Sequence, residues 1–176
     1  MKTNWKIDNL HSQIGFKVKH MMITNVKGTF GTFNADADTE EDDFSSAKFT
    51  FNAAIDSINT GVADRDAHLK SNDFFDSEKF PNLSFNSTSV SKKSDDTLEI
   101  SGDLTIKGVT KKITLEAEHG GIVVDPYGQT KAGLTIEGKI KRSDFGLTWS
   151  AITEAGSIVV GDEIKLSCDL QFIKQN

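Results

Sequence analysis

Arginine is rare in this chain, and both arginines lie beside acidic residues. The 20 basic residues include only Arg65, which Asp66 follows directly, and Arg142, which Asp144 follows after one serine. The planar guanidinium group binds carboxylates and phosphates through two parallel hydrogen bonds, which an ammonium group cannot do. Each arginine therefore either anchors a loop through a carboxylate (Asp66, Asp73 or Asp144) or binds an anionic head group at the rim of a site. We expect the anchoring role.

Other residue types that support chemistry have ordinary explanations here. The four histidines lack the spacing of metal ligands, although His68 lies close to Arg65 and Asp66. The acidic run Asp36–Asp43 lacks EF-hand spacing, so we expect a solvated loop. A single cysteine, Cys168, excludes an internal disulfide. Motifs of serine hydrolases, P-loops and dinucleotide-binding folds are absent. The sequence thus indicates no catalytic residues, no metal site and no cofactor.

Composition narrows the class of protein further. The chain has 176 residues, of which 36% are hydrophobic, enough for one domain with a core. Its net charge of −6 argues against nucleic-acid binding. Because no strictly apolar run exceeds three residues, we expect no transmembrane helix. The N-terminal residues do not resemble a secretion signal. We expect a single domain, residues 1–176, in the cytoplasm, or in the periplasm if the N-terminus is a processed form.

Alternation of apolar and polar residues with a period of two dominates the chain. It predicts about eight antiparallel β-strands, each with one apolar and one polar face. Closure into a barrel would bury the apolar face and remove the sheet edges, and a two-sheet sandwich would fit the pattern equally well. The predicted strands lie near residues 12–20, 26–38, 48–55, 82–90, 98–107, 112–117, 134–141 and 163–172.

A short segment near residues 61–79 carries the helical signal. Thr60 is the predicted N-cap, and Phe80-Pro81 returns the chain to an extended conformation. We expect this segment to cross one end of the strands. Phe74 and Phe75 should contact the interior, since two adjacent exposed phenylalanines would form an apolar patch.

The apolar strand faces are rich in phenylalanine, with twelve in the chain against one tyrosine. Such an interior offers bulk without hydrogen-bonding groups and suits apolar contents. A one-residue slip in register would turn every one of these side chains outward. The residues predicted to point inward are Phe16, Val18, Phe51, Phe85, Leu104, Ile106, Leu115, Leu134, Ile136, Leu166, Cys168 and Leu170.

Motifs in order along the chain resemble the YceI-like, polyisoprenoid-binding family. The opening ones are Trp5-Lys6-Ile7-Asp8, His11-Ser12, Phe16-x-Val18-x-His20 and Lys27-Gly28-Thr29-Phe30. The most specific stretch is RDAHLKSNDFFD at residues 65–76, continued by Phe80-Pro81 and Phe85. The later ones are GDLTIKGVT at residues 102–110, RSDFGL at 142–147 and VGDEI at 160–164. The resemblance covers residues 5 to about 172.

The resemblance implies a lipocalin-like antiparallel barrel that holds a long apolar lipid, with a polyisoprenoid as the expected ligand, and no catalysis. It also implies a homodimer as the default assembly. Phe145 and Trp149 join Phe74, Phe75 and the inward residues as candidates to line the ligand site. The candidates for head-group binding or loop anchoring are Arg65, Asp66, His68, Arg142 and Asp144.

Two other functions stay open. The protein could be an enzyme that acts on a prenyl pyrophosphate lipid through Arg65, Asp66 and His68. It could also be a stress-related structural protein with a packed interior. Eight strands enclose a space that side chains can fill or that one slender ligand can occupy. Strand spacing alone does not choose between these contents.

Overall fold

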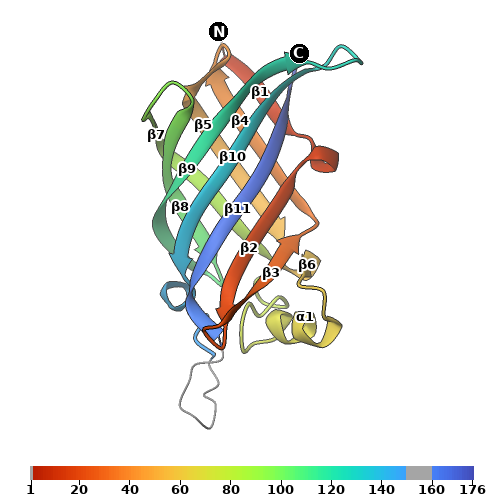
Figure 1. Cartoon of the computed structure of the whole chain (residues 1–176), viewed down its shortest axis with the longest axis vertical. Helices are drawn as coiled ribbons and strands as arrows, with labels where there is room; N and C mark the ends of the chain where they lie inside the picture. Colours follow the sequence, from red (N-terminus) through yellow and green to blue (C-terminus); the bar gives the residue numbers. More distant parts are fainter. Residues whose placement is uncertain (1, 150–159) are drawn as a thin grey trace.

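The computed structural model describes residues 2–149 and 160–176 and shows a closed antiparallel β-barrel with one short helix (Figure 1). The helix is α1 (Ala63–Lys70). The strands are β1 (Lys2–Ile7), β2 (Gln13–His20), β3 (Thr24–Phe30), β4 (Phe33–Glu40), β5 (Asp43–Ala54), β6 (Ile58–Asn59), β7 (Asn82–Lys92), β8 (Thr97–Ile106), β9 (Val109–Val124), β10 (Thr130–Lys141) and β11 (Val160–Lys174).

Six of these segments combine into three interrupted barrel strands. β1 and β2 flank the short helical turn η1 (Asn9–His11) and pair with the two halves of β11. β4 and β3 then pair with β1 and β2, and β5 and β6 pair with β4 and β3. β7 to β11 follow in sequence order. The described segments therefore form eight strands in a closed up-and-down barrel. The part of β3 beyond its pairing with β6, residues 24–28, pairs only with β2.

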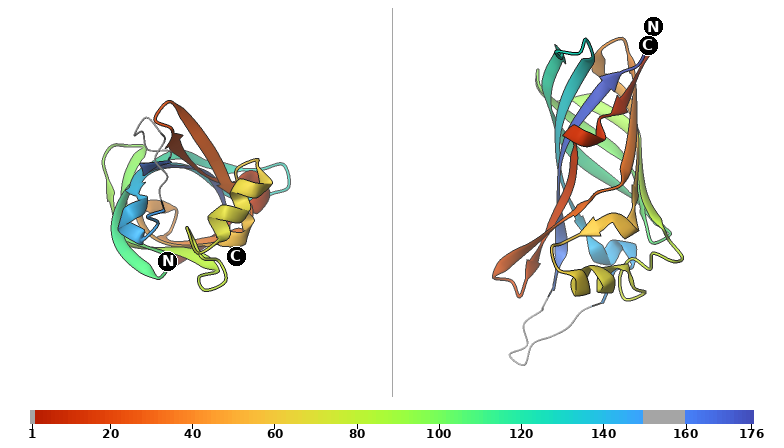
Figure 2. Two further views of the ribbon diagram at one scale, coloured as in Figure 1. Left: turned by 90° about the horizontal axis from the view of Figure 1, so that it is seen from below. Right: turned by 90° about the vertical axis from the view of Figure 1, so that its right-hand side faces the viewer.

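The two ends of the barrel differ. Both termini lie at one end, and α1 lies at the other (Figures 1 and 2). At the end with the termini, aromatic rings fill the interior. Trp5 and Phe172 are 0% and 1% exposed, and the Phe44 ring centroid lies 5.0 Å from Trp5 and 6.5 Å from Phe172. The indole nitrogen of Trp5 donates to the hydroxyl of buried Thr39, so the polar atom of the indole has a partner.

The predicted barrel is confirmed, and the sandwich alternative is wrong. β1 was not expected from the pattern. Within the acidic run, Asp36–Glu40 lie in β4 and Asp43 begins β5, so the predicted solvated loop is confined to the turn at Glu41 and Asp42. No helix within the described ranges is long and apolar enough to cross a membrane.

The predicted short helix is confirmed. α1 ends at Lys70, and turns follow it to residue 79. Thr60 is not the N-cap. The N-cap is Val62, whose side chain cannot accept a capping hydrogen bond. Thr60 instead donates its backbone N–H and its hydroxyl to the carboxylate of Asp66, inside the helix.

Candidate ligand-binding cavity

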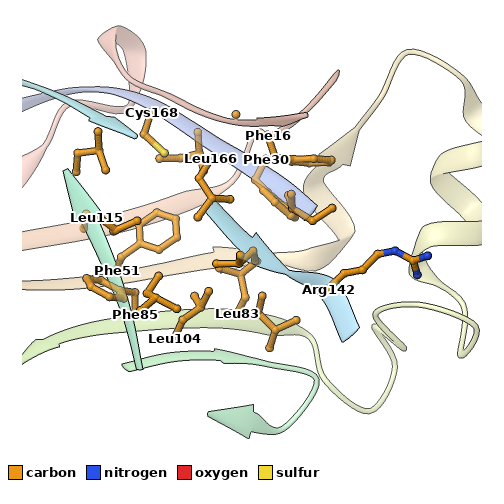
Figure 3. Close-up of a pocket in the computed structure, with 18 of the residues that line it drawn as sticks. Phe16, Phe30, Phe51, Leu83, Phe85, Leu104, Leu115, Arg142, Leu166 and Cys168 are labelled. Atoms are coloured by element: carbon orange, nitrogen blue, oxygen red, sulfur yellow. The ribbon is translucent and has the colours of Figure 1, made fainter. Parts of the chain in front are cut away.

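The barrel encloses a cavity of about 200 Å³ between the aromatic end and α1 (Figure 3). One water molecule needs roughly 10–15 Å³ of such space, so the cavity has room for part of an extended ligand. Almost every side chain that lines it is apolar; Thr50 and Arg142 are the polar exceptions. A cavity of this composition holds water poorly and favours apolar ligands.

Three inward-facing glycines let neighbouring side chains lie flat against the wall. A Cβ atom on Gly28 would collide with the ring of Phe16, its cross-strand partner. A Cβ atom on Gly102 would lie 2.6 Å from Cζ of Phe85, and one on Gly138 would collide with Leu115. Because these large side chains cover glycine backbone, their bulk stays out of the centre of the barrel.

Most of the residues predicted to line a ligand site surround this cavity. Thirteen of the sixteen do so: Phe16, Val18, Phe51, Phe74, Phe75, Phe85, Leu104, Ile106, Leu115, Ile136, Leu166, Cys168 and Leu170. Leu134 and Phe145 are only 2% and 1% exposed, but they pack in the core beside the cavity rather than on its wall. The ring of Trp149 lies behind Phe74. For these three residues the expected position on the wall is wrong.

Sequence reasoning missed other lining residues. Among them are Ile14, Phe30, Phe49, Leu69, Leu83, Ile100 and Phe172. Ile14, Phe49 and Ile100 belong to the same alternating faces and could have been found by extending those patterns. Leu69 lies on α1, where no period-two pattern exists.

Aromatic rings cover the cavity at the α1 end. Phe75 contacts Phe30 edge to face at 6.3 Å between centroids, and Phe74 is 6% exposed. The imidazole of His68 lies edge-on to Phe74 at 5.0 Å and to Trp149 at 4.7 Å, and its Nε2 lies 2.8 Å from Asp73. His68 therefore joins α1 to the segment after β10, on the outer side of this cover.

Arg142 begins the short helix η3 (Arg142–Phe145) at the same end of the cavity. Its side chain is buried, and in Figure 3 its guanidinium group points away from the apolar lining. The guanidinium donates at 2.7–3.2 Å to four backbone carbonyls, those of Leu147, Trp149, Val160 and Gly161. Arg142 thus ties η3 and the chain after it to the start of β11.

The expected carboxylate partners of the arginines are wrong. Asp144 is exposed, and Arg142 forms no ion pair with a carboxylate of the described residues. Burial lowers the pKa of Arg142, and the charge of Asp162 opposes that effect. The carboxylate of Asp162 itself accepts from the backbone and hydroxyl of Ser143. Asp162 therefore compensates the buried charge of Arg142 without forming an ion pair with it. The VGDEI motif did not reveal this role of Asp162.

Arg65 also acts on backbone and hydroxyl groups. It donates to the hydroxyl and the carbonyl of Thr60, at 2.7 Å each. Asp66 accepts from the same threonine. Arg65, Asp66 and His68 do not line the cavity, and each has a partner in the structure of the α1 segment. Within the described ranges, no group of three metal-ligating side chains occurs.

Cys168 lies on the cavity wall in the middle of β11. Burial raises the pKa of its thiol to about 11. The thiol therefore stays protonated at neutral pH and behaves as a small apolar group rather than a nucleophile.

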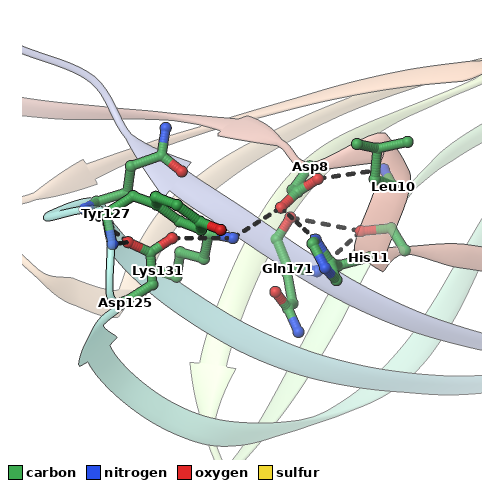
Figure 4. Close-up of polar contacts among 9 residues, drawn as sticks. Asp8, Leu10, His11, Asp125, Tyr127, Lys131 and Gln171 are labelled. Carbon is green, nitrogen blue, oxygen red and sulfur yellow. Dashed lines mark hydrogen bonds and ion pairs between the residues drawn. The ribbon is translucent and has the colours of Figure 1, made fainter.

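A polar cluster on the outside of the barrel pins the interruption between β1 and β2 (Figure 4). The ammonium group of Lys131 lies 3.0 Å from Asp8 and 3.3 Å from Asp125, and His11 lies 2.8 Å from Asp8. Burial alone would raise the pKa of Asp8, but the contacts with Lys131 and His11 outweigh it and lower that pKa. The sequence patterns did not predict this cluster, because its members are up to 123 residues apart.

These features define a class of protein: a closed eight-stranded barrel with an apolar interior cavity that is covered at one end by a helix and aromatic rings. The YceI-like domain matches residues 5–172, and the chain belongs to this family.

Relatives and solved structures agree with that assignment. A UPF0312 protein of Staphylococcus aureus (strain MSSA476) is 35% identical over 171 residues, 97% of each chain. The crystal structure of the Campylobacter jejuni YCEI protein is 34% identical, covers 90% of each chain and superposes with a TM-score of 0.78. A polyisoprenoid binding domain from Saccharophagus degradans, implicated in plant cell wall breakdown, covers 97% of this chain and 98% of its own. Its identity of 13% and TM-score of 0.67 show a shared fold.

Proposed function

We propose that this protein binds one long apolar lipid chain, with a polyisoprenoid as the favoured ligand, inside the barrel and carries or sequesters it without catalysis. The observation that carries the proposal is the cavity itself, whose lining along β2, β5, β8 and β11 is apolar except for Thr50. Each CH₂ group removed from water contributes roughly 0.8 kcal/mol. A chain of several isoprene units would thus bind without polar contacts.

The side chains around the cavity support binding over packing. Flat packing of Phe16 and Phe85 on glycine backbone preserves an empty centre, which a structural protein with a filled core would not need. The shared fold with a domain named for polyisoprenoid binding supports the choice of ligand class. The residues of the enzymatic alternative, Arg65, Asp66 and His68, are engaged in the structure of the α1 segment, and no specific observation favours catalysis.

Organic extraction of the purified protein, followed by mass spectrometry, tests the proposal directly. We expect recovery of a long apolar lipid at near-stoichiometric amounts, or uptake of an added polyprenol by the lipid-free protein. An empty barrel that takes up no polyprenol would contradict the proposal.

A matched pair of substitutions on β11 sharpens this test. Cys168→Phe places a ring in the cavity, whereas Ser167→Phe places the same ring on the exposed outer face one residue earlier. Cys168→Phe should reduce retained lipid by at least about tenfold, because an overfilled wall leaves no space for the chain. Ser167→Phe should retain lipid as the unsubstituted protein does.

A further inference from the structure

The hairpin that joins β2 to β3 ends in three exposed apolar residues. Met21, Met22 and Ile23 are 41%, 59% and 75% exposed. The backbone N–H of Ile23 donates to the carbonyl of His20, and the two methionines between them have φ values of 53° and 61°. Turns with positive φ at both central residues favour asparagine and glycine. Two methionines in this strained conformation indicate a role for the tip beyond closing the hairpin.

A row of four lysines crosses the outer face of this hairpin and the two strands beside it. Lys27 faces Lys17, Lys17 faces Lys165, and Lys165 faces Lys139 in the register of β3, β2, β11 and β10. Like charges in directly opposed positions destabilise an antiparallel pair.

Glu137 and Glu163 are the acidic residues closest along β10 and β11 to this row, each two residues from its lysine. Among the described residues, no carboxylate forms an ion pair with any of the four lysines. Residues 9–35, which include the whole hairpin, contain no aspartate or glutamate, although the net charge of the chain is −6. The hairpin is therefore a local basic surface on an acidic protein.

Figure 2 shows the hairpin projecting at the α1 end of the barrel, away from both termini. The acidic turn between β4 and β5 lies at the other end, beside the N-terminus, where Glu40 faces Lys2. The basic and apolar hairpin thus lies at the end where α1 covers the cavity, an end that also carries the exposed acidic residues Asp64, Asp73 and Glu78 of the α1 segment.

We propose that the β2–β3 hairpin docks the protein onto anionic phospholipid bilayers. Met21, Met22 and Ile23 enter the boundary between head groups and acyl chains, and the lysine row binds the anionic head groups. This docking follows from the surface alone. Docking would also turn the covered end of the cavity toward the bilayer during lipid exchange, and this consequence rests on the proposed function.

Co-sedimentation of the purified full chain with vesicles tests the docking surface. We expect binding to vesicles of equal parts phosphatidylcholine and phosphatidylglycerol, weakening with salt, and little binding to phosphatidylcholine alone. The double variant M21N/M22G removes apolar surface and supplies the residues that the turn prefers. Its Tm should be equal or higher while vesicle binding falls at least about tenfold. The control V123T/V124T, at the opposite end of the barrel, should bind unchanged.

The lysine row has its own matched pair. K17Q/K27Q should lower binding to the anionic vesicles by about 30-fold at low salt, since each lysine near a membrane surface contributes about one kcal/mol. Relief of the opposed charges should leave the Tm equal or higher. K48Q/K92Q makes the same change in net charge with exposed lysines on β5 and β7 and should bind as before.

Three results would overturn docking: no binding to the anionic vesicles, equal losses in the control variants, or a change of oligomeric state in M21N/M22G by sedimentation velocity. The third result would indicate that Met21 and Met22 contact a second copy of the chain. Lipid extraction from the same preparations separates this proposal from the proposed function. A docking variant that loses vesicle binding but still yields lipid on extraction would be impaired in docking alone. A protein that yields no lipid but still binds vesicles would contradict the lipid-carrier function alone.

Discussion

At the end of the barrel that holds the termini, inward rings face alanines and meet one another, whereas on part of the cavity wall the rings of Phe16 and Phe85 lie over glycines. Trp5 and Phe49 face Ala37 from either side, and Phe172 faces Ala132. The rings of Phe44, Phe49 and Phe172 meet one another at centroid distances of 6.2–6.5 Å. No methyl group exists at Gly28, so the ring of Phe16 falls back onto the backbone.

This difference shows how one pattern of alternating apolar and polar residues builds both a packed end and a cavity. The strands keep their register and their inward face along the whole barrel. The small residue opposite a ring affects the filling without deciding it alone, since Phe51 faces Ala35 and still lines the cavity. The cavity end then needs other means of stability, which Arg142 and the α1 segment provide.

The largest expected effect comes from Arg142→Lys, which tests that stability. A lysine keeps the charge but cannot donate to four carbonyls in the positions that the guanidinium reaches. We expect the free energy of unfolding to fall by about 2–4 kcal/mol, since several buried carbonyls lose a charged donor. Urea denaturation measures the change. Arg65→Lys, at a half-buried site with hydrogen bonds to one threonine, should cost under about 1 kcal/mol.

The same pair of variants discriminates between anchoring and head-group binding. Unchanged unfolding of Arg142→Lys, together with weaker retention of a prenyl phosphate than of the uncharged prenol, would assign Arg142 to the ligand and contradict the anchoring role.

A smaller effect is expected from Gly28→Ala, which places an alanine opposite a cavity ring, as at the packed end. The added methyl group displaces the ring of Phe16 toward the centre of the barrel. We expect a stability loss of about 1–3 kcal/mol from strain and several-fold weaker uptake of added polyprenol, measured by extraction. Gly133→Ala on β10 is the matched control, because nothing lies within 4 Å of its added Cβ. Equal lipid uptake by both variants would show that the ring position does not control the cavity.

Much of this architecture is present in the sequence. Period-two alternation predicted most of the strands and the inward face of β2, β5, β8 and β11, because burial on one side of a strand is a local property. The adjacent Phe74 and Phe75 predicted contact of the α1 segment with the interior for the same reason.

What the patterns could not supply depends on distant partners. The position of the Phe16 ring depends on its cross-strand partner Gly28, and single-strand patterns do not pair residues. The partners of Arg142 are backbone carbonyls, which no sequence motif displays, so proximity to Asp144 was misleading. The Lys131 cluster joins residues near the N-terminus to the β9–β10 hairpin and has no local signal.

The smallest expected effect tests the packed end through His119, whose ring lies 5.1 Å from that of Phe44. Its Nε2 is buried without a hydrogen-bond partner among the described residues. Burial lowers the pKa of His119, and the charge of Asp43 only partly opposes this. The folded state therefore binds a proton less readily than the unfolded state, so the stabilising contribution is complete above about pH 6.5 and is lost as the pH falls below it. His119→Phe should remove this loss, which we expect to be under about 1 kcal/mol between pH 7.5 and 5. Thermal unfolding at both pH values measures it as a smaller drop in Tm for the variant. Equal drops in the two proteins would show that the packed end tolerates a charged imidazole, and the contrast between the filled and hollow ends would then be weaker than the structure indicates.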